Sequence, residues 1–415
     1  GWGGYWAWDP VENSALMPWL AMTAFVHSVM VQKRRGMFRM WNMIIIIIAF
    51  TLAQMGMFIN RGGPVPSVHS FAQSTMGWLF LMFMTVTLII SLAIFIWRLD
   101  SLKSRGQLES ILSRESAFLA QNILFLTVAF VTLWGTIFPV FSEVASGDTM
   151  TIGQPYFNII NGPILLGIIF LMGVGPLIPW RRSSVRSLIR LLRIPVLVAL
   201  ATFIILSAAG GTKLFATISF ATLSLALSGI LLEWIRGTNS WHKRGDSYIQ
   251  GYLKLVSRNR PRYGGYVVHI GIIMLASGIT ASSFYSVQKD IFMKPGDVAS
   301  LGNYTFAYVD GNRQHYTNRE EFIASFRVYN DQSVVDTLDA KRIFYRDFKI
   351  AATIGAIRST PLEDFYIVPS EFNENNEAVF RVLINPMIWW MWASGPVIFL
   401  GVLIGLWPKR RSPPT

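Results

Sequence analysis

The chain has 415 residues, of which 52% are hydrophobic and only 14% are charged, and it contains no cysteine. Soluble domains carry roughly 25% charged residues, so this composition excludes an ordinary soluble protein and indicates a membrane protein. The lack of cysteine excludes disulfides, thiolate metal sites and a cysteine nucleophile within the chain. The formal net charge of +13 leaves two explanations, a membrane topology or a nucleic-acid partner.

The chain opens on GWGGYWAWDPVEN, which predicts a helix start. Asp9 suits the N-cap, Pro10 suits the first helical position, and Glu12 completes a capping box. The sequence has no Met at residue 1 and begins inside this motif, so we expect an upstream segment that is absent here.

Four aromatic rings crowd the residues before this helix, together with glycines: Trp2, Tyr5, Trp6 and Trp8. One interpretation is an aromatic belt, because Trp and Tyr collect at the membrane surface. The other is a wall for a large planar apolar ligand, with porphyrin as the obvious candidate, because Gly3 and Gly4 allow a flat partner to approach the backbone closely.

Nine segments are long and apolar enough to cross a bilayer, which takes about 17–25 residues. They are residues 15–32, 41–59, 76–97, 117–140, 159–179, 194–210, 214–235, 265–284 and 386–407. The sixth is the weakest, and only a GGTK turn separates it from the seventh, so this pair is predicted to form a helical hairpin.

Lysine and arginine concentrate in alternate connections, which hold 23 of the 36 basic residues: 33–39, 98–114, 181–193, 236–262 and 409–411. Because cytoplasmic loops are enriched in Lys and Arg, we expect these connections on the cytoplasmic side. The aromatic cluster, loop 60–75 and stretch 285–384 are then expected in the periplasm, outside a bacterial inner membrane. This topology accounts for the basic charge, so we expect no nucleic-acid partner.

Stretch 285–384 is predicted to fold outside the bilayer as a small β-rich domain, sandwich or barrel, because YTFAYVD and FIASFRVYN alternate and DGN and NENN suit turns. The expected fold is therefore a polytopic α-helical membrane protein with one small β-rich extracytoplasmic domain. The expected parts are an aromatic loop (1–14), a helical bundle (15–284), the β-rich domain (285–384), a last helix (385–408) and a basic tail (409–415).

Two histidines lie inside predicted spans. His27 lies shortly before Lys33 in the first span, and His269 shortly after Arg262 in the eighth, so the topology places both in the cytoplasmic half at a similar depth. An ionisable residue inside a membrane is a functional candidate, and two imidazoles at one depth suit a haem iron. The alternative is that each is hydrogen bonded to a neighbouring helix.

His69 lies in the outer loop RGGPVPSVHSFA, whose prolines and glycines predict a specific backbone course. Its two interpretations are a solvent-exposed histidine and an outer ligand. Arg61, the only positive charge in that loop, suits either a bidentate pair with a ligand carboxylate or snorkelling at the end of its span. His242 and His315 are expected to be solvated.

Several stretches together resemble one family. WGGYWAWDPVEN looks like the tryptophan-rich "WWD" motif of haem-handling membrane proteins. Together with SALMPWL, SVHSFA and MKPGD, it resembles the CcmF family, haem lyase subunits of system I cytochrome c maturation. The resemblance covers essentially the whole chain, as the C-terminal two-thirds or so of such a protein. The close paralogue NrfE stays open.

The resemblance implies roles for named residues. His27 and His269 would hold the iron of a resident transmembrane haem b. His69 would be the second of two outer histidines that hold the iron of the delivered haem, the first lying upstream of Gly1. The implied catalytic set is His69, Trp6, Trp8 and Asp9. The implied haem-binding set is His27, His269, His69, Trp2, Tyr5, Trp6, Trp8 and Arg61.

The implied reaction joins haem, the substrate, to an apocytochrome c. Thiols of a Cys-x-x-Cys-His segment add across the haem vinyl groups as thioethers, which needs no cysteine from the enzyme. Positioning would be the main contribution of the protein. The implied partners are the haem chaperone CcmE, a CcmH-type apocytochrome-binding protein and the lipid bilayer, with the β-rich domain as a docking platform.

Two other functions compete with this one. A haem exporter of the CcmC or CcsA type shares the WWD motif but has neither the long 285–384 domain nor the His27 and His269 pair. A polytopic scaffold without haem would use the aromatic residues only as a membrane belt. An absorption spectrum separates the scaffold from both haem proteins.

Overall fold

The computed structural model describes residues 4–65, 67, 75–104, 106–210, 213–330 and 333–408. Within these ranges, nine helices are long and apolar enough to cross a membrane, as the sequence predicts. The chain divides into two compact units. The helical unit holds Trp2–Ala199 and Ser224–Glu233, and the sandwich unit holds Leu200–Leu223 and Trp234–Thr415.

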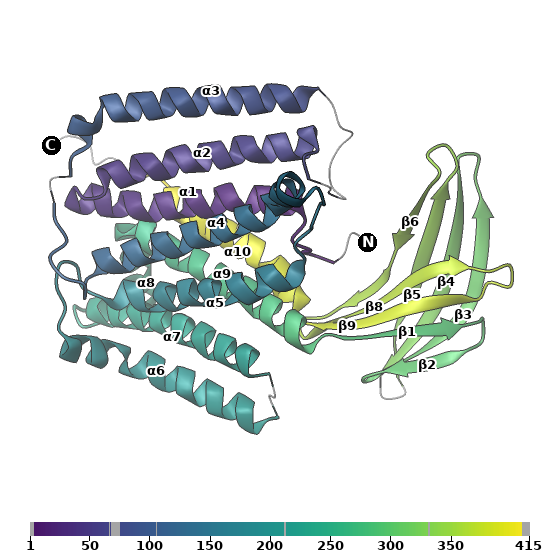
Figure 1. Ribbon diagram of the computed structural model, residues 1–415. Helices are drawn as coiled ribbons and strands as arrows, with labels where there is room; N and C mark the ends of the chain where they lie inside the picture. Colours follow the sequence, from purple (N-terminus) through teal and green to yellow (C-terminus); the bar gives the residue numbers. More distant parts are fainter. Residues whose placement is uncertain are drawn as a thin grey trace. The chain divides into compact units, whose positions relative to one another are not determined.

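Five long helices lie wholly within the helical unit: α1 (Pro10–Arg35), α2 (Arg39–Gly62), α3 (Met76–Trp97), α4 (Arg114–Ser146) and α5 (Gln154–Val174). α1 packs between α2 and α4, while α3 packs on α2 and α5 packs on α4 (Figure 1). The buried side chains between these helices are mostly apolar. One cluster is Leu20, Ala24, Ile45, Phe125, Val128, Ala129 and Ile168.

Local sequence fixes the helix ends. Asp9 caps α1 with the predicted capping box, and Gly36 ends the helix with a left-handed φ of 67°. Ser113 caps α4 by accepting from the backbone N–H of Ser116, and Gly147 ends it with φ 80°. α1 and α4 therefore extend beyond the predicted spans 15–32 and 117–140 into polar flanks, because capping chemistry rather than hydropathy sets their limits.

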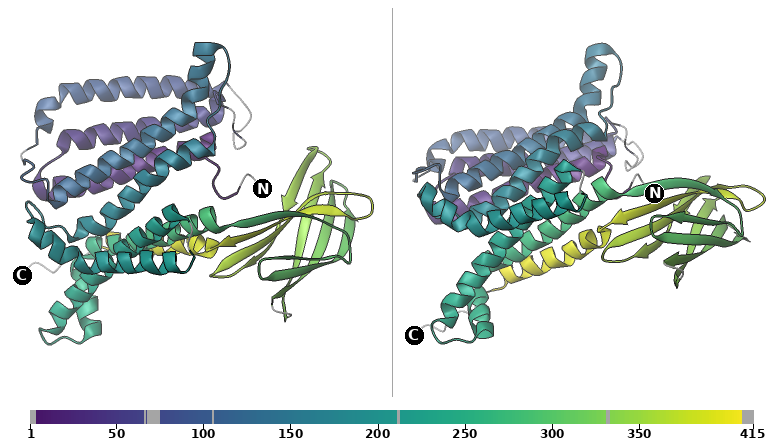
Figure 2. Two further views of the ribbon diagram at one scale, coloured as in Figure 1. Left: turned by 60° about the horizontal axis from the view of Figure 1, so that its bottom comes forward. Right: turned by 90° about the horizontal axis from the view of Figure 1, so that it is seen from below.

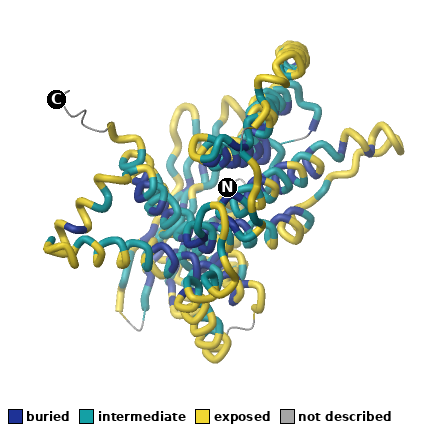
Figure 3. The backbone as a smooth tube through the Cα atoms, turned by 90° about the vertical axis from the view of Figure 1, so that its left-hand side faces the viewer, coloured by how far each residue is buried: buried dark blue, intermediate teal, exposed yellow. Residues whose placement is uncertain are grey.

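α3 is the most exposed of the spans, with none of its most apolar stretch buried. Figure 3 shows long exposed stretches of backbone next to buried ones. The side chains of Val86, Ile89 and Ile90, among others, are exposed on α3. In a membrane-spanning chain such apolar faces suit contact with lipid.

The connections contain helices that the sequence analysis does not predict. Two short 3-10 helices, η1 (Leu99–Leu102) and η2 (Gly175–Leu177), follow α3 and α5. α8 (Tyr248–Arg258) lies within the basic stretch 236–262 and begins at a capping box formed by Ser247 and Gln250. Hydropathy alone misses such elements because they are too short and too polar to register as spans.

α6 (Val185–Ala208) and α7 (Leu214–His242) form the sixth and seventh spans. The predicted sixth span starts at 194, but the helix starts nine residues earlier, within a basic stretch. Arg186, Arg190 and Arg193 suit the helix as well as apolar residues do, because Arg has a high helix propensity.

Glycines let α9 (Arg260–Tyr285) and α10 (Ile388–Leu406) approach closely in the sandwich unit. Gly264, Gly271 and Gly278 recur at seven-residue spacing on α9. A methyl group at Gly264 would lie 2.5 Å from the backbone nitrogen of Gly405, and one at Gly271 would lie 2.5 Å from a side-chain carbon of Ile398. Packing of small residues is a common basis of helix association in membranes.

The β-rich domain is a sandwich of two antiparallel sheets (Figure 2), so of the two predicted architectures, sandwich and barrel, the first is observed. One sheet has the strand order β1-β9-β8-β7, and the other has the order β2-β3-β4-β5-β6. The strands are β1 (Val287–Met293), β2 (Val298–Leu301), β3 (Tyr304–His315), β4 (Arg319–Asn330), β5 (Ser333–Tyr345), β6 (Ile350–Ile354), β7 (Ala356–Ser359), β8 (Glu363–Phe372) and β9 (Ala378–Pro386).

Aromatic rings fill the sandwich core. Tyr304, Phe306 and Tyr308 point inward at alternate positions of β3, as strand geometry requires. The ring of Tyr308 stacks on Phe326 at 5.1 Å, and Phe326 meets Phe380 of the opposite sheet edge-on at 4.9 Å. Such contacts between the sheets fix their spacing and add to the hydrophobic stabilisation.

Two tyrosines make the sandwich sensitive to high pH. Burial, helped by the charge of Asp310, raises the pKa of Tyr308 to about 12. Burial, helped by the charge and hydrogen bond of Asp364, raises the pKa of Tyr366 to about 12. Because folding favours the protonated phenols, their stabilisation is complete below about pH 10 and is lost as pH rises through about 12.

Replacing Tyr308 or Tyr366 with Phe is therefore expected to weaken the loss of sandwich stability between about pH 10 and pH 12. Tyrosinate absorbance during an alkaline titration, with unfolding followed in parallel, measures both effects. An exposed tyrosine, Tyr316, is the matched control, and Tyr316→Phe is expected to leave the alkaline transition unchanged. Equal effects of all three substitutions would contradict the assignment.

Candidate functional site

The aromatic loop before α1 is held against α5. The ring of Trp8 stacks on Phe157 with a centroid separation of 5.0 Å and an interplanar angle of 9°. Its indole Nε1 donates to the side-chain oxygen of Asn158 at 2.7 Å. Trp6 meets the edge of Trp8 at 5.7 Å. Phe157 and Asn158 thus fix both the plane and the rotation of the Trp8 ring.

The backbone of Trp8 is also constrained. It has a φ of 57°, which is left-handed and costly for a bulky residue. The side-chain amide of Asn13 donates to the carbonyl oxygen of Trp8 at 3.0 Å and to Thr136 Oγ1 at 3.0 Å. Asn13 is fully buried between α1 and α4, so an interior polar contact holds the loop in its strained conformation.

Asp9 positions the loop through hydrogen bonds. Its carboxylate accepts from the backbone N–H of Val11 at 2.9 Å and from the hydroxyl of Ser67 at 2.5 Å. The Glu12 carboxylate accepts from the backbone N–H groups of Asp9 and Ala7. Because Ser67 lies two residues before His69 in the sequence, Asp9 connects the aromatic loop to the segment that precedes His69. These contacts give Asp9 a positioning role, and its predicted catalytic role stays a prediction.

Four further residues are predicted to belong to this site: Trp2, Tyr5, Arg61 and His69. Trp2 and His69 lie outside the described residues. Tyr5 is half exposed at the start of the loop. Arg61 is exposed in the last turn of α2, close in sequence to Ser67. The described part of this predicted site is therefore a fixed Trp8 ring, the neighbouring Trp6 and the more accessible Tyr5.

His27 lies in α1 among aromatic side chains. Its Nδ1 lies 2.8 Å from the carbonyl oxygen of Thr23. A carbonyl oxygen can only accept, so this contact requires a proton on Nδ1 and leaves the lone pair of a neutral imidazole on Nε2. Phe118 and Phe125 of α4 lie 5.9 Å and 6.2 Å from the ring. A fixed tautomer in an aromatic setting is what an axial haem ligand needs.

His269 lies half-buried in the middle of α9. It stands two residues before Gly271, on the helix that packs closely on α10. His27 belongs to the helical unit and His269 to the sandwich unit. The predicted ligation of one iron by both therefore stays a prediction.

The two remaining histidines are exposed, as the sequence analysis expects. His242 stacks on Tyr248 at 4.0 Å, and its Nδ1 lies 2.8 Å from the carbonyl oxygen of Asp246. His315 lies 3.6 Å from Glu320 in the sandwich. The hydrogen bond from Arg346 holds the pKa of the Glu320 carboxyl below its usual value. Both histidines have local structural contacts.

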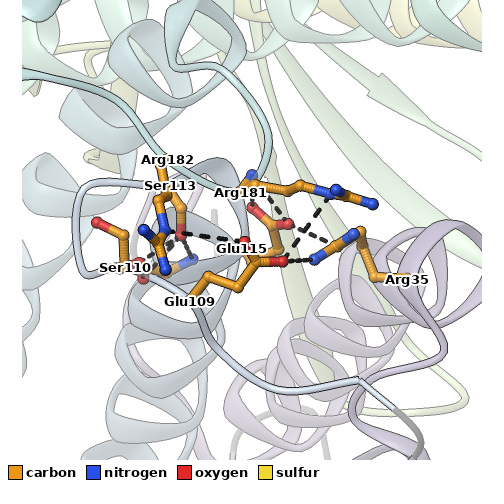
Figure 4. A network of polar contacts seen from close by, with 8 residues as sticks. Arg35, Glu109, Ser110, Ser113, Glu115, Arg181 and Arg182 are labelled. Atoms are coloured by element: carbon orange, nitrogen blue, oxygen red, sulfur yellow. Dashed lines mark hydrogen bonds and ion pairs between the residues drawn. The ribbon is translucent and has the colours of Figure 1, made fainter.

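A cluster of charged residues joins the ends of α1 and α4 to the segment after η2 (Figure 4). Glu115, only 2% exposed, pairs with Arg35 at 2.9 Å and accepts from the backbone N–H of Arg181 at 3.1 Å and 3.0 Å. Arg35 also contacts Glu109 at 2.6 Å. Arg181 has a left-handed φ of 70°, so the buried carboxylate holds a strained backbone as well as a guanidinium.

Comparison with known proteins agrees with the fold. The family model for cytochrome c assembly proteins matches residues 1–63, and the model for the CcmF C-terminal β-sandwich matches residues 284–386. The cytochrome c-type biogenesis proteins CcmF of Haemophilus influenzae and Pseudomonas aeruginosa are 32% and 33% identical to the chain, each over 99% of it. A solved structure of the cytochrome c haem lyase CcmF covers 98% of the chain with a TM-score of 0.77 and 26% identity.

The chain is similar to CcmF proteins over nearly its whole length. It spans about three fifths of the curated CcmF proteins that it matches: 62% of the Haemophilus influenzae protein and 61% of the Pseudomonas aeruginosa protein. It likewise covers 61% of the solved CcmF chain. The matched sandwich model agrees with the two-sheet architecture of β1 to β9.

Several residues around the site have no signal in the local sequence. Phe157 and Asn158 are far from Trp8 in the sequence, and 150 positions separate Trp8 from Asn158. Phe118 looks like any apolar residue of its span. Glu115 looks like a solvated charge at a span end, yet it is buried. Only Ser67 has a sequence cue, because it stands beside His69 in a Pro- and Gly-containing loop.

Proposed function

We propose that this chain is the part of a cytochrome c haem lyase that holds haem against the Cys-x-x-Cys-His segment of an apocytochrome c. The observation that carries the proposal is the rigid aromatic loop, with Trp8 fixed by Phe157 and Asn158. An immobile aromatic ring at a helix start suits a flat apolar substrate. Similarity to CcmF proteins supports the same function.

In the proposed reaction each substrate thiol adds across a haem vinyl group. A carbon–sulfur bond forms at one vinyl carbon, and the thiol proton goes to the other, so the addition needs no oxidant. The chain contributes no cysteine, so its role in the reaction is to position the haem and the substrate thiols. The aromatic loop holds the haem ring, and His69 holds the haem iron. Asp9 aligns the two loops through its hydrogen bond with Ser67. Arg61, at the end of α2, pairs with a propionate.

The proposed topology follows from the basic loops. The connections 33–39, 98–114, 181–193 and 236–262 lie in the cytoplasm. The aromatic loop and the sandwich lie in the periplasm of a bacterium, and the helices cross its inner membrane. Haem then arrives at the outer site on CcmE, and the apocytochrome arrives through a CcmH-type partner that docks on the sandwich.

A resident haem b belongs to the same proposal, and His27 and His269 are the residues that would hold its iron. The residues around His27 fit such a group, because Thr23 fixes the tautomer and Phe118 and Phe125 form an apolar wall. When bound, a haem b supplies electrons that keep the substrate iron reduced. Within this chain, α1 orients the His27 imidazole, and α9 carries the His269 imidazole.

A haem exporter of the CcmC or CcsA type is the second candidate. Such a protein would share the aromatic loop, so the loop does not distinguish the two functions. The sandwich does, because residues 284–386 match the CcmF C-terminal model. We therefore favour the lyase.

Trp8→Ala is expected to lower cytochrome c formation by roughly tenfold, because an aromatic contact contributes about 0.5–1.5 kcal/mol beyond burial. Haem-stained cytochrome c in cells, together with haem captured by the purified protein, measures the effect. Trp134→Ala is the matched control, since Trp134 is exposed on α4 and packs only with Phe138 and Phe141 among the ring contacts described for it.

Phe157→Ala is expected to lower cytochrome c formation as Trp8→Ala does. It leaves the Trp8 side chain intact but removes the ring on which Trp8 stacks.

Replacing Trp6, Trp8 and Asp9 together should abolish capture of the delivered haem and leave haem b in place. Parental cytochrome c levels in both Trp8→Ala and Phe157→Ala would contradict the proposed outer site.

A further inference from the structure

We propose that Arg34 binds a propionate of the haem whose iron His27 holds, over a floor formed by Trp180. This inference rests on the proposed haem b site. It identifies which end of the ligand faces the charged cluster at the ends of α1 and α4. All the residues that carry it belong to the helical unit.

Arg34 follows His27 by seven residues, so the two lie on the same face of α1, about 10 Å apart along its axis. A haem held through its iron at His27 presents an apolar ring near the iron and two carboxylates at one edge. The groups on this face of α1 follow the same order, because the His27 imidazole lies inside the span and the Arg34 guanidinium lies at its end.

A continuous aromatic wall joins the two positions. The ring of Phe118 lies 5.9 Å from His27 and 6.1 Å from Trp180. The guanidinium carbon of Arg34 lies 4.6 Å from the Trp180 ring centroid. An apolar ring can therefore follow protein aromatic surface from His27 to Arg34, and the cation–π contact holds Arg34 in place at its end.

The neighbouring charges leave Arg34 available for an anion. Glu115 and Glu109 are engaged by Arg35, while Arg114 donates to the carbonyl oxygens of Ile178 and Pro176 at 2.8 Å and 2.5 Å. Across the described part of the chain, Arg34 has no carboxylate within ion-pair distance.

A second donor lies in the same place. The indole Nε1 of Trp180 is buried and has no hydrogen-bond acceptor among the described residues. A carboxylate at Arg34 would provide an acceptor beside that ring. Guanidinium groups suit carboxylates because their paired N–H groups match two oxygens. A propionate therefore suits the Arg34 cation.

The test compares haem with its dimethyl ester, which keeps the ring and the iron but has no carboxylates. Membranes from a haem-deficient host, containing the parent protein or a variant, are titrated with each compound, and binding is read from the absorption spectrum. The parent is expected to bind haem about tenfold more tightly than the ester, because charge-assisted pairs are strong. Arg34→Gln should reduce this preference to less than about threefold, and Arg34→Lys should keep part of it.

Lys33→Gln is the matched control, because Lys33 is the neighbouring exposed cation on α1, and it should keep the parental preference. A parental preference in Arg34→Gln would overturn the inference and leave the haem site intact. So would an effect of Arg34→Gln confined to binding of anionic lipid vesicles, which would identify a lipid headgroup as the anion. A parent protein that binds neither compound, or a His27→Ala variant that binds both normally, would overturn the haem site itself.

Discussion

His27→Ala is expected to strip the b-type haem from the purified protein or to destabilise its binding severely. The substitution removes the imidazole that we propose to hold the haem iron. The Thr23 carbonyl fixes its tautomer, and Phe118 and Phe125 lie beside its ring. His269→Ala is expected to have the same effect. A pyridine haemochrome assay and a reduced absorption spectrum measure the loss, and added imidazole should restore part of the spectrum.

Two other histidines serve as controls for that result. His242→Ala should keep the haem b spectrum, because His242 is exposed and stacks on Tyr248. His69→Ala should also keep it but should weaken capture of the haem that arrives from outside. A parental haem b spectrum in both His27→Ala and His269→Ala would refute the assignment. Selective loss of haem b from His69→Ala would refute it as well.

Glu115→Ala is the second substitution with a large expected effect. It leaves Arg35 and the backbone N–H of Arg181 without their buried acceptor, and breaking a buried ion pair in this way costs about 3–5 kcal/mol. Thermal unfolding in detergent, followed by size-exclusion chromatography of the surviving protein, should show a clearly lower midpoint.

Glu109→Ala is the matched control for this pair. Glu109 also contacts Arg35, but its side chain is 34% exposed, and such ion pairs contribute about 1 kcal/mol or less. A small effect of Glu109→Ala beside a large effect of Glu115→Ala is therefore expected. Equal effects would mean that the burial of Glu115 does not set its contribution to stability.

The sequence alone predicts the parts of the fold that local chemistry controls. Asp9, Pro10 and Glu12 specify the start of α1, and the capping box forms as expected. Long apolar stretches specify nine membrane-spanning helices in the described ranges. Alternation and turn residues specify the β-rich domain, although they leave sandwich and barrel unresolved because both use the same strand pattern.

The contacts around the candidate site require tertiary structure. Nothing near Trp8 in the sequence indicates that Phe157 will stack on it or that Asn158 will accept from it. The role of Glu115 is hidden for a similar reason, because a charged residue at a span end is normally solvated. Its burial arises only when the segment after η2 folds over the end of α4.

The strand order gives the sandwich a simple relation to its chain. β1 and β9 are antiparallel neighbours, with Val287 opposite Ile384. β1 follows α9 directly, and β9 leads directly into α10. The chain therefore enters and leaves the domain at one place, between two helices that already pack together through glycines.

Such a domain is an insertion into a helical hairpin. Its core consists of its own side chains, and the contact between α9 and α10 lies outside it. A short turn in place of Val287–Pro386 would still join the two helices, because the ends to be joined are already adjacent. The helix pair that carries His269 therefore keeps its own glycine-mediated contact whatever the length of the segment inserted between its two helices.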